Sequence, residues 1–208
     1  MNYYQDITLL PDADITLGFI WQKVYQQIHL ALVENKIAEN QSAVAVGFPK
    51  YINPQGQDQR KDFPLGNKLR LFAQTEEALQ QLKIESWLSR LTDYCHIKSI
   101  QPVPDNIEAY VCFKRKHFKS NLLKEAKRRA KYKNETQEEA LQHFQHYQKE
   151  CKLPYINMSS LSMQKRNSKA SRQYKLFISR ETGDNLLHGE FNCFGLSKAE
   201  KTATIPWF

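Results

Sequence analysis

The segment TLGFIWQKVYQQIHLA, residues 16–31, decides the first half of the fold. Its apolar residues recur at three- and four-residue spacing: Leu17, Ile20, Val24, Ile28 and Ala31. This period predicts an amphipathic helix with one buried face. Thr16 stands where an N-cap is expected. Before the helix, residues 3–10 alternate as a strand does, and the run PDAD at 11–14 separates the two elements.

The residues that follow this helix predict three more strands. The apolar run SAVAVGF at 42–48 and the run LRLFA at 69–73 are expected to form buried strands, and the polar, Pro- and Gly-containing stretch at 50–67 forms a loop between them. KSIQPV at 98–103 is expected to be the last strand. A second helix is expected to begin after Thr75, which precedes two glutamates.

The order strand–helix–strand–strand–helix–strand is that of a ferredoxin-like (RRM-like) domain, which we expect over residues 1–103. PVPDN at 102–106 has two prolines and indicates a short linker. The remainder, 104–208, is expected to be a second α+β region. Its predicted helices are about 119–133 and 136–148, and its predicted strands are 109–114, 155–158, 174–179 and about 187–194. The fold class is therefore α+β.

The helix expected at 119–133 is strongly basic. From Lys114 to Lys133 the chain reads KRKHFKSNLLKEAKRRAKYK, with ten basic residues and one acid, Glu125. Four of the cations share one helical face: Lys124, Lys127, Arg128 and Lys131. Repulsion between such like charges costs roughly 0.2–0.5 kcal/mol per pair, which a polyanion would offset. The simpler alternative is a solvated helix face, but such a face normally mixes both signs of charge.

A second basic cluster consists of Lys165, Arg166, Lys169 and Arg172, in a polar loop that could equally be plain protein surface. The formal net charge of +8 suits a nucleic acid, although net charge also serves solubility. RNA or DNA is favoured over a membrane, because the chain has no lipid anchor and no large apolar helix face beside these charges.

Several functions are excluded by what the sequence lacks. It has no signal-peptide pattern, no run of about 18 apolar residues, no phosphate-binding glycine loop and no Cys or His cluster at metal spacing. The separated cysteines Cys95, Cys112, Cys151 and Cys193 are typical of free thiols. We therefore expect a cytoplasmic protein with no cofactor and no metal.

Four segments, in this order along the chain, carry a family resemblance: IHLALV around His29, FKSN at 118–121, PYINMSSLS at 154–162, and GLSK at 195–198 followed by IPWF at 205–208. In order and spacing they resemble the CRISPR repeat-processing endoribonucleases of type I-F systems. The resemblance implies a ferredoxin-like domain followed by an α+β region with an arginine-rich helix. It also implies binding of the CRISPR repeat RNA hairpin and cleavage at the 3′ base of its stem without a metal.

The same resemblance implies partners and site residues. The enzyme would keep the mature crRNA bound among the other type I-F Cas proteins of an antiviral surveillance complex. His29 matches the catalytic histidine, Ser160 the serine that positions the attacking 2′-hydroxyl, and Ser162 a further active-site serine. The RNA-binding residues expected on this basis are Arg115, His117, Lys119, Lys124, Lys127, Arg128, Lys131, Tyr174 and Phe194.

Some of these positions have individual roles in the resemblance. Arg115 would read a guanine in the major groove, and Tyr174 would stack on the base pair at the foot of the stem. His117 replaces an amide side chain, and Phe194 stands where a tyrosine is expected.

The expected chemistry uses a nucleophile that RNA itself carries. A histidine near its ordinary pKa of about 6.5 can accept the 2′-hydroxyl proton, and the oxygen then displaces the 5′-oxygen to leave a 2′,3′-cyclic phosphate. The general acid has no assigned residue. Two alternatives stay open: a catalytically inactive hairpin-binding subunit, motivated by Phe194, and a DNA-binding accessory protein, motivated by the basic helix.

Overall fold

The computed structural model describes residues 1–52, 63–118, 122–145, 152–160 and 172–208. These residues form a mixed α+β fold with antiparallel sheets, as expected. The chain divides into two compact units, one of Met1–Arg115 with Leu153–Phe208 and one of Lys116–Lys152. The predicted boundary at 103–104 lies inside the first unit, and the division into 1–103 and 104–208 stays a prediction.

The first unit contains a sheet built around the first strand, with the order β4-β5-β1-β6, and β7 also pairs with β1. Its strands are β1 (Tyr3–Leu9), β4 (Ala45–Gly47), β5 (Lys68–Ala73), β6 (Cys95–Ile97) and β7 (Gln101–Pro102). Every pairing is antiparallel, with Tyr3 opposite Ala73 and Ile7 opposite Ile97. The strands predicted at 3–10 and 69–73 are confirmed.

Two predicted strands are shorter than expected. The run 42–48 is divided between β3 (Gln41–Ser42) and β4, because Ser42 Oγ accepts from Val44 N at 3.0 Å and donates to Val44 O at 3.0 Å, which turns the backbone locally. The expected strand at 98–103 is present only as β7, after β6. The sequence analysis also missed β2 (Lys36–Ala38), which pairs with β3.

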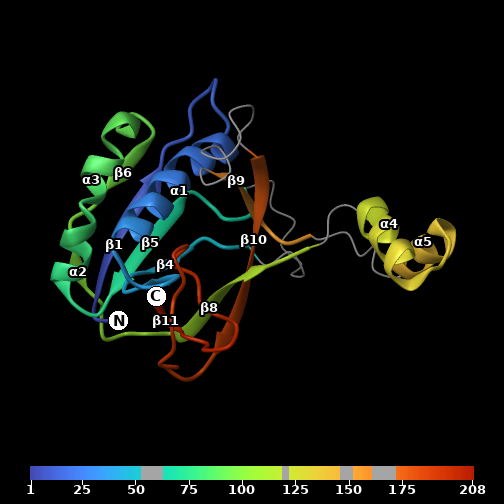
Figure 1. Ribbon diagram of the computed structural model, residues 1–208. Coiled ribbons are helices and arrows are strands. Elements are labelled where there is room, and N and C mark those ends of the chain that lie inside the picture. Colours follow the sequence, from blue (N-terminus) through green and yellow to red (C-terminus); the bar gives the residue numbers. More distant parts are fainter. Residues whose placement is uncertain (53–62, 119–121, 146–151, 161–171) are drawn as a thin grey trace. The chain divides into compact units, whose positions relative to one another are not determined.

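The helices of the first unit are α1 (Leu17–Glu34), α2 (Glu76–Leu82), the short α3 (Ile84–Trp87) and a 3-10 turn at Ser89–Leu91. The predicted apolar face of α1 is confirmed, since Ile20, Val24 and Ile28 are at most 2% exposed. Thr75 caps α2 by accepting from Ala78 N at 3.3 Å. Both α1 and α2 contact β1, and α1 also contacts β9 (Tyr155–Ser160), a strand of the second sheet (Figure 1).

The second sheet has the order β11-β8-β10-β9. Its strands are β8 (Ala109–Lys116), β9 (Tyr155–Ser160), β10 (Arg172–Gly183) and β11 (Ile205–Trp207). The strand predicted near 187–194 is wrong: only Phe191 forms isolated bridges there, and a turn follows it. The sequence analysis missed β11, because three residues with a central Pro206 give little strand signal. Both sheets and α1 share one apolar core.

A buried ion pair ties the first sheet to the last residue. Asp6 and Arg70 are 3% and 7% exposed, and Arg70 donates to the Asp6 carboxylate through Nε at 2.6 Å and Nη2 at 3.1 Å. Arg70 Nη1 also donates to Phe208 O at 3.2 Å, and its guanidinium lies 4.1 Å from the centre of the Phe208 ring.

The second unit contains α4 (Leu122–Lys133) and α5 (Gln137–Gln145), which confirms the two predicted helices (Figure 1). They pack through small side chains, with Ala126, Ala130 and Ala140 buried. Thr136 caps α5: its Oγ accepts from Glu139 N at 3.2 Å, and Glu139 Oε2 accepts from Thr136 N at 2.8 Å.

Candidate active site around His29

His29 lies in the last third of α1, half-buried, beside the loop that follows β10. Its Nδ1 is 2.8 Å from the carbonyl oxygen of Cys193. A carbonyl oxygen can only accept a hydrogen bond, so the proton of this bond belongs to Nδ1. In a neutral imidazole this leaves Nε2 without a proton, as a base requires.

The ring of His29 is stacked on the ring of Phe194, with centroids 4.1 Å apart and planes 2° apart. Burial lowers the pKa of His29 below its ordinary 6.5, and the positive charge of Arg115 lowers it further. The hydrogen bond to Cys193 acts in the opposite direction, and the net shift is downward. The imidazole is therefore neutral at pH 7, in the protonation state of a general base.

A tight turn holds the loop against α1. Asn192 Oδ1 accepts from Phe194 N at 2.8 Å, and Gly195 N donates to Asn192 O at 2.8 Å. Gly195 has a φ of +71°, and a Cβ there would stand 2.3 Å from Val46 Cγ2, so the position requires glycine. Gly195 O then accepts from Val46 N at 2.8 Å, which fixes the turn to the first sheet.

Three expected RNA-binding residues lie close to one another beside His29. The guanidinium of Arg115, on β8, lies 5.0 Å from the centre of the Phe194 ring and 5.5 Å from that of Tyr174, on β10. Arg115 alternates with the buried Val111 and Phe113, so its side chain leaves β8 on the core side of the sheet. The structure thus brings Arg115, Tyr174 and Phe194 together beside His29.

Ser160 ends β9 on the side that faces α1. It alternates with Ile156 and Met158, which are at most 1% exposed, so the three side chains share one face of the strand. The neighbouring Ser159 N donates to Gln26 Oε1 at 3.0 Å. Gln26 is one helical turn before His29, and this bond anchors the end of β9 to that part of α1.

The described residues of this cluster do not include the other predicted site residues. Ser162 and Lys119 lie outside the described residues, as do Lys165, Arg166 and Lys169 of the second basic cluster. Only the backbone of Lys124 and of Arg172 is described. His117 and the basic helix belong to the second unit, which is described by itself.

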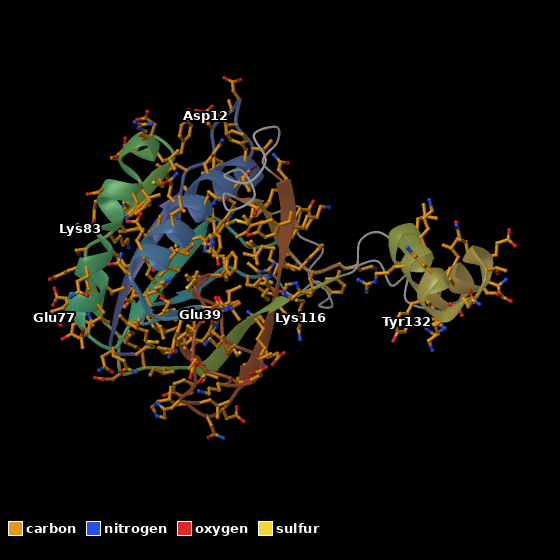
Figure 2. All side chains as sticks on the ribbon, viewed as in Figure 1. Asp12, Glu39, Glu77, Lys83, Lys116 and Tyr132 are labelled. Atoms are coloured by element: carbon orange, nitrogen blue, oxygen red, sulfur yellow. The ribbon has the colours of Figure 1, made fainter. Side chains whose placement is uncertain are left out.

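On α4, the predicted basic face is exposed. Lys127, Arg128 and Lys131 lie opposite Ala126 and Ala130, which pack on α5. A further cation, Arg129, is paired with Glu135. Tyr132, labelled in Figure 2, is 88% exposed beside this face. An exposed helix face with three cations is the pattern of a polyanion-binding helix.

Two parts of the site were not predicted from the sequence. The carbonyl of Cys193 is a backbone group, so the residue type does not reveal its role. A strand was predicted at about 187–194, so the turn at Asn192–Gly195 was not expected. The glycine of the GLSK segment was the available signal for that turn. Tyr25 was also missed, although it precedes His29 by four residues and its hydroxyl donates to Phe194 O at 2.7 Å.

Within the part of the chain that the structure describes, no three His, Cys, Asp or Glu side chains are grouped so that they could hold a metal ion. Cys95, Cys112 and Cys193 are not joined by disulfides. None of the described helices combines the length and apolar character needed to cross a bilayer.

The chain is similar to known proteins over its full length. Residues 4–208 match the family model described as CRISPR-associated protein (Cas_Csy4). The chain is 32% identical over 212 positions to a CRISPR-associated endonuclease Cas6/Csy4 of Escherichia coli (strain UTI89 / UPEC), and 26% identical over 213 positions to one of Pseudomonas aeruginosa (strain UCBPP-PA14). Each comparison covers 100% of both chains.

One solved structure, titled "An RAMP protein binding different RNA substrates", aligns with 99% of this chain and 100% of its own at 11% identity. Its TM-score of 0.35 is too low to support a shared fold.

Proposed function

Because the chain belongs to the Cas_Csy4 family of CRISPR-associated proteins, we propose that it is an endoribonuclease that processes CRISPR repeat RNA. It binds the hairpin of the repeat and cleaves pre-crRNA at the 3′ base of the stem. It then stays on the mature crRNA as a subunit of the type I-F surveillance complex.

The observation that carries the proposal is the bond from His29 Nδ1 to Cys193 O. It gives the imidazole an unprotonated Nε2, and the lowered pKa keeps the ring neutral at physiological pH. A histidine in this state suits removal of a proton from a ribose hydroxyl. Positioned proton transfer of this kind accelerates a reaction by about 10²–10⁴-fold.

The reaction proceeds without a metal, because the RNA supplies its own nucleophile. Nε2 of His29 takes the proton from the 2′-hydroxyl, and the 2′-oxygen attacks the adjacent phosphorus. The bond from phosphorus to the 5′-oxygen breaks, and that oxygen takes a proton from water, which leaves a 2′,3′-cyclic phosphate and a 5′-hydroxyl. Ser160 holds the 2′-hydroxyl by hydrogen bonding, and Ser162 assists it.

Recognition is divided between base contacts and phosphate contacts. Arg115 reads a guanine by a bidentate bond, and Tyr174 stacks on the base pair at the foot of the stem. The exposed cations of α4 contact the phosphates of the stem and supply affinity that does not depend on sequence. Lys119, Lys124 and His117 are further RNA-binding residues.

The same family membership supports a ferredoxin-like arrangement of residues 1–103. The four strands expected from sequence correspond to β1, β4, β5 and β7. The second lies beside the third, the third beside the first, and the first beside the fourth, all antiparallel. This order supports the proposed ferredoxin-like domain, in which α1 carries the catalytic histidine.

The direct test is cleavage of a labelled CRISPR repeat hairpin by the purified full chain in excess EDTA. We expect a single cut at the 3′ base of the stem and a product whose terminal phosphate resists alkaline phosphatase until acid opens the ring, as a cyclic phosphate does. A cut that appears only when Mg²⁺ is added would contradict the mechanism. Co-elution of the product with the protein tests retention.

Phe194 supports a second candidate, a hairpin-binding subunit that does not cut, because no hydroxyl is available on the ring that stacks on His29. Tight binding of the hairpin with no cleavage after prolonged incubation would favour this candidate. Cleavage by the unaltered chain excludes it.

A further inference from the structure

Tyr25 and His29 hold two successive carbonyl groups. They are four residues apart on α1, so their side chains leave the helix on the same face. The hydroxyl of Tyr25 donates to Phe194 O at 2.7 Å, and His29 Nδ1 donates to Cys193 O at 2.8 Å. One turn of α1 therefore fixes the backbone of Cys193 and Phe194 at two points.

The ring of Tyr25 cannot turn away from this bond without repacking the core. Its side chain is 0% exposed, and it is stacked on Phe48 with ring centroids 6.2 Å apart and planes 25° apart. Trp21 covers it from the preceding helical turn, with centroids 6.5 Å apart. A phenol hydroxyl so deeply buried needs a partner, and the carbonyl of Phe194 is that partner.

Fixing Phe194 O also restrains the carbonyl that His29 uses. The peptide unit from Phe194 to Gly195 is planar, so its orientation is set once its oxygen is bound. Only the two backbone torsions of Phe194 separate this unit from the Cys193 carbonyl. The ring of Phe194, which stacks on the imidazole, is attached to the same residue.

We propose that Tyr25 is a positioning residue for RNA cleavage: its hydroxyl holds the Cys193–Phe194 backbone so that Cys193 keeps the proton of His29 on Nδ1 and leaves Nε2 as the base. The inference rests on the proposed endoribonuclease function. Tyr25 acts through His29 and does not contact the RNA, because it is fully buried.

The chain offers a matched control in Tyr51. This tyrosine is 6% exposed, and its hydroxyl donates to the carbonyl of Ile178 at 3.0 Å, a bond of the same kind. Tyr25→Phe and Tyr51→Phe each remove one buried hydroxyl and leave one carbonyl without its donor. Only Tyr25→Phe frees a carbonyl in the loop that contacts His29, because Phe194 follows Cys193 directly.

The first measurement is single-turnover cleavage of a repeat hairpin that the unaltered protein cuts, together with hairpin affinity. We expect Tyr25→Phe to reduce the cleavage rate constant about three- to tenfold, the equivalent of one hydrogen bond, with unchanged affinity. Tyr51→Phe should cut at the rate of the unaltered protein. Equal rates for Tyr25→Phe and the unaltered protein would overturn the proposal, as would equal slowing by both variants.

The second measurement does not depend on activity. Long-range ¹H–¹⁵N NMR correlations of the imidazole report which nitrogen carries the proton. We expect a single Nδ1–H tautomer of His29 in the unaltered protein and in Tyr51→Phe, and a mixture of tautomers in Tyr25→Phe. A single Nδ1–H tautomer in all three proteins would sink the proposal. If the unaltered protein cut no hairpin, the proposed function would fail, and this comparison would still decide the role of Tyr25.

Discussion

The imidazole of His29 lies flat against the ring of Phe194, with a centroid separation of 4.1 Å and an angle of 2° between the planes. The phenyl ring thus covers one face of the imidazole and keeps water from it. A proton donor reaches the ring most readily in its plane, at Nε2, because Nδ1 is bound to Cys193. This geometry has consequences that can be measured.

Replacing the base should separate cutting from binding. We expect His29→Ala to lower the single-turnover cleavage rate by about 10²–10⁴-fold while hairpin affinity is retained, since affinity comes from the basic surface. His96→Ala is the control, because His96 is exposed on β6. Normal cleavage by His29→Ala would remove His29 from the mechanism.

The pH dependence follows from the lowered pKa of His29. A general base works in its neutral form, so the rate should rise with pH and level off once the imidazole has lost its proton. Because burial lowers the pKa of His29, we expect half of the maximal rate below pH 6.5. A single-turnover rate profile between about pH 4.5 and 8 checks this. A midpoint above 6.5 would mean that another group titrates.

Arg115 should influence both recognition and this profile. We expect Arg115→Gln to weaken hairpin binding by about 1–3 kcal/mol and to relax base preference at one position of the stem. Removing its charge should also raise the pKa of His29, because Arg115 lowers it, so the rate profile moves to higher pH. Lys175→Gln, an exposed cation on the same sheet, is the control. If Arg115→Gln weakened binding to every stem sequence by the same amount, Arg115 would contact a phosphate and not a base.

The charges on α4 should act through counterion release. Lys127→Gln and Lys131→Gln should each weaken binding to all hairpins alike and reduce the slope of log affinity against log salt by about one. Lys98→Gln, an exposed cation in the first unit, should leave the slope unchanged. Salt titrations of binding to matched RNA and DNA hairpins test this and separate the RNA-binding from the DNA-binding interpretation.

Loss of the buried ion pair Asp6–Arg70 should lower the free energy of unfolding. Burial is the largest influence on the pKa of Asp6 and raises it, but Arg70 and Lys68 together lower it below its ordinary 3.8. Asp6→Asn leaves Arg70 buried without its partner, and we expect a loss of about 3–5 kcal/mol in the free energy of unfolding. Urea unfolding measures it, with exposed Asp93→Asn as the control. In the unaltered protein this stabilisation is lost only as pH falls through the lowered pKa.

Periodicity in the sequence was enough to predict the long elements. The stripe from Ile20 to Ala31 and the cap at Thr75 depend on neighbours within one helical turn, and both are confirmed. The short strands could not be predicted in the same way. Residues 205–207 form a strand only because β8, far away in sequence, pairs with them.

In the candidate site, too, some residues could be identified from the sequence, whereas others depend on contacts with distant parts of the chain. His29 and Ser160 were identified by resemblance to a family, since a histidine beside a core stripe has no signal of its own. The partners of His29 could not be found from sequence. Cys193 contributes a backbone carbonyl, and Tyr25 is distinguished only by a hydroxyl whose acceptor is 169 residues away.

Among the side chains that the structure describes, the apolar contact between α4 and α5 is made by the methyl groups of three alanines and the partly buried Leu141. So small an apolar contact contributes little to the free energy of helix pairing. We therefore expect trypsin to cut the lysine- and arginine-rich helix readily when RNA is absent. Bound hairpin would protect it, so nuclease treatment during purification would yield a nicked protein.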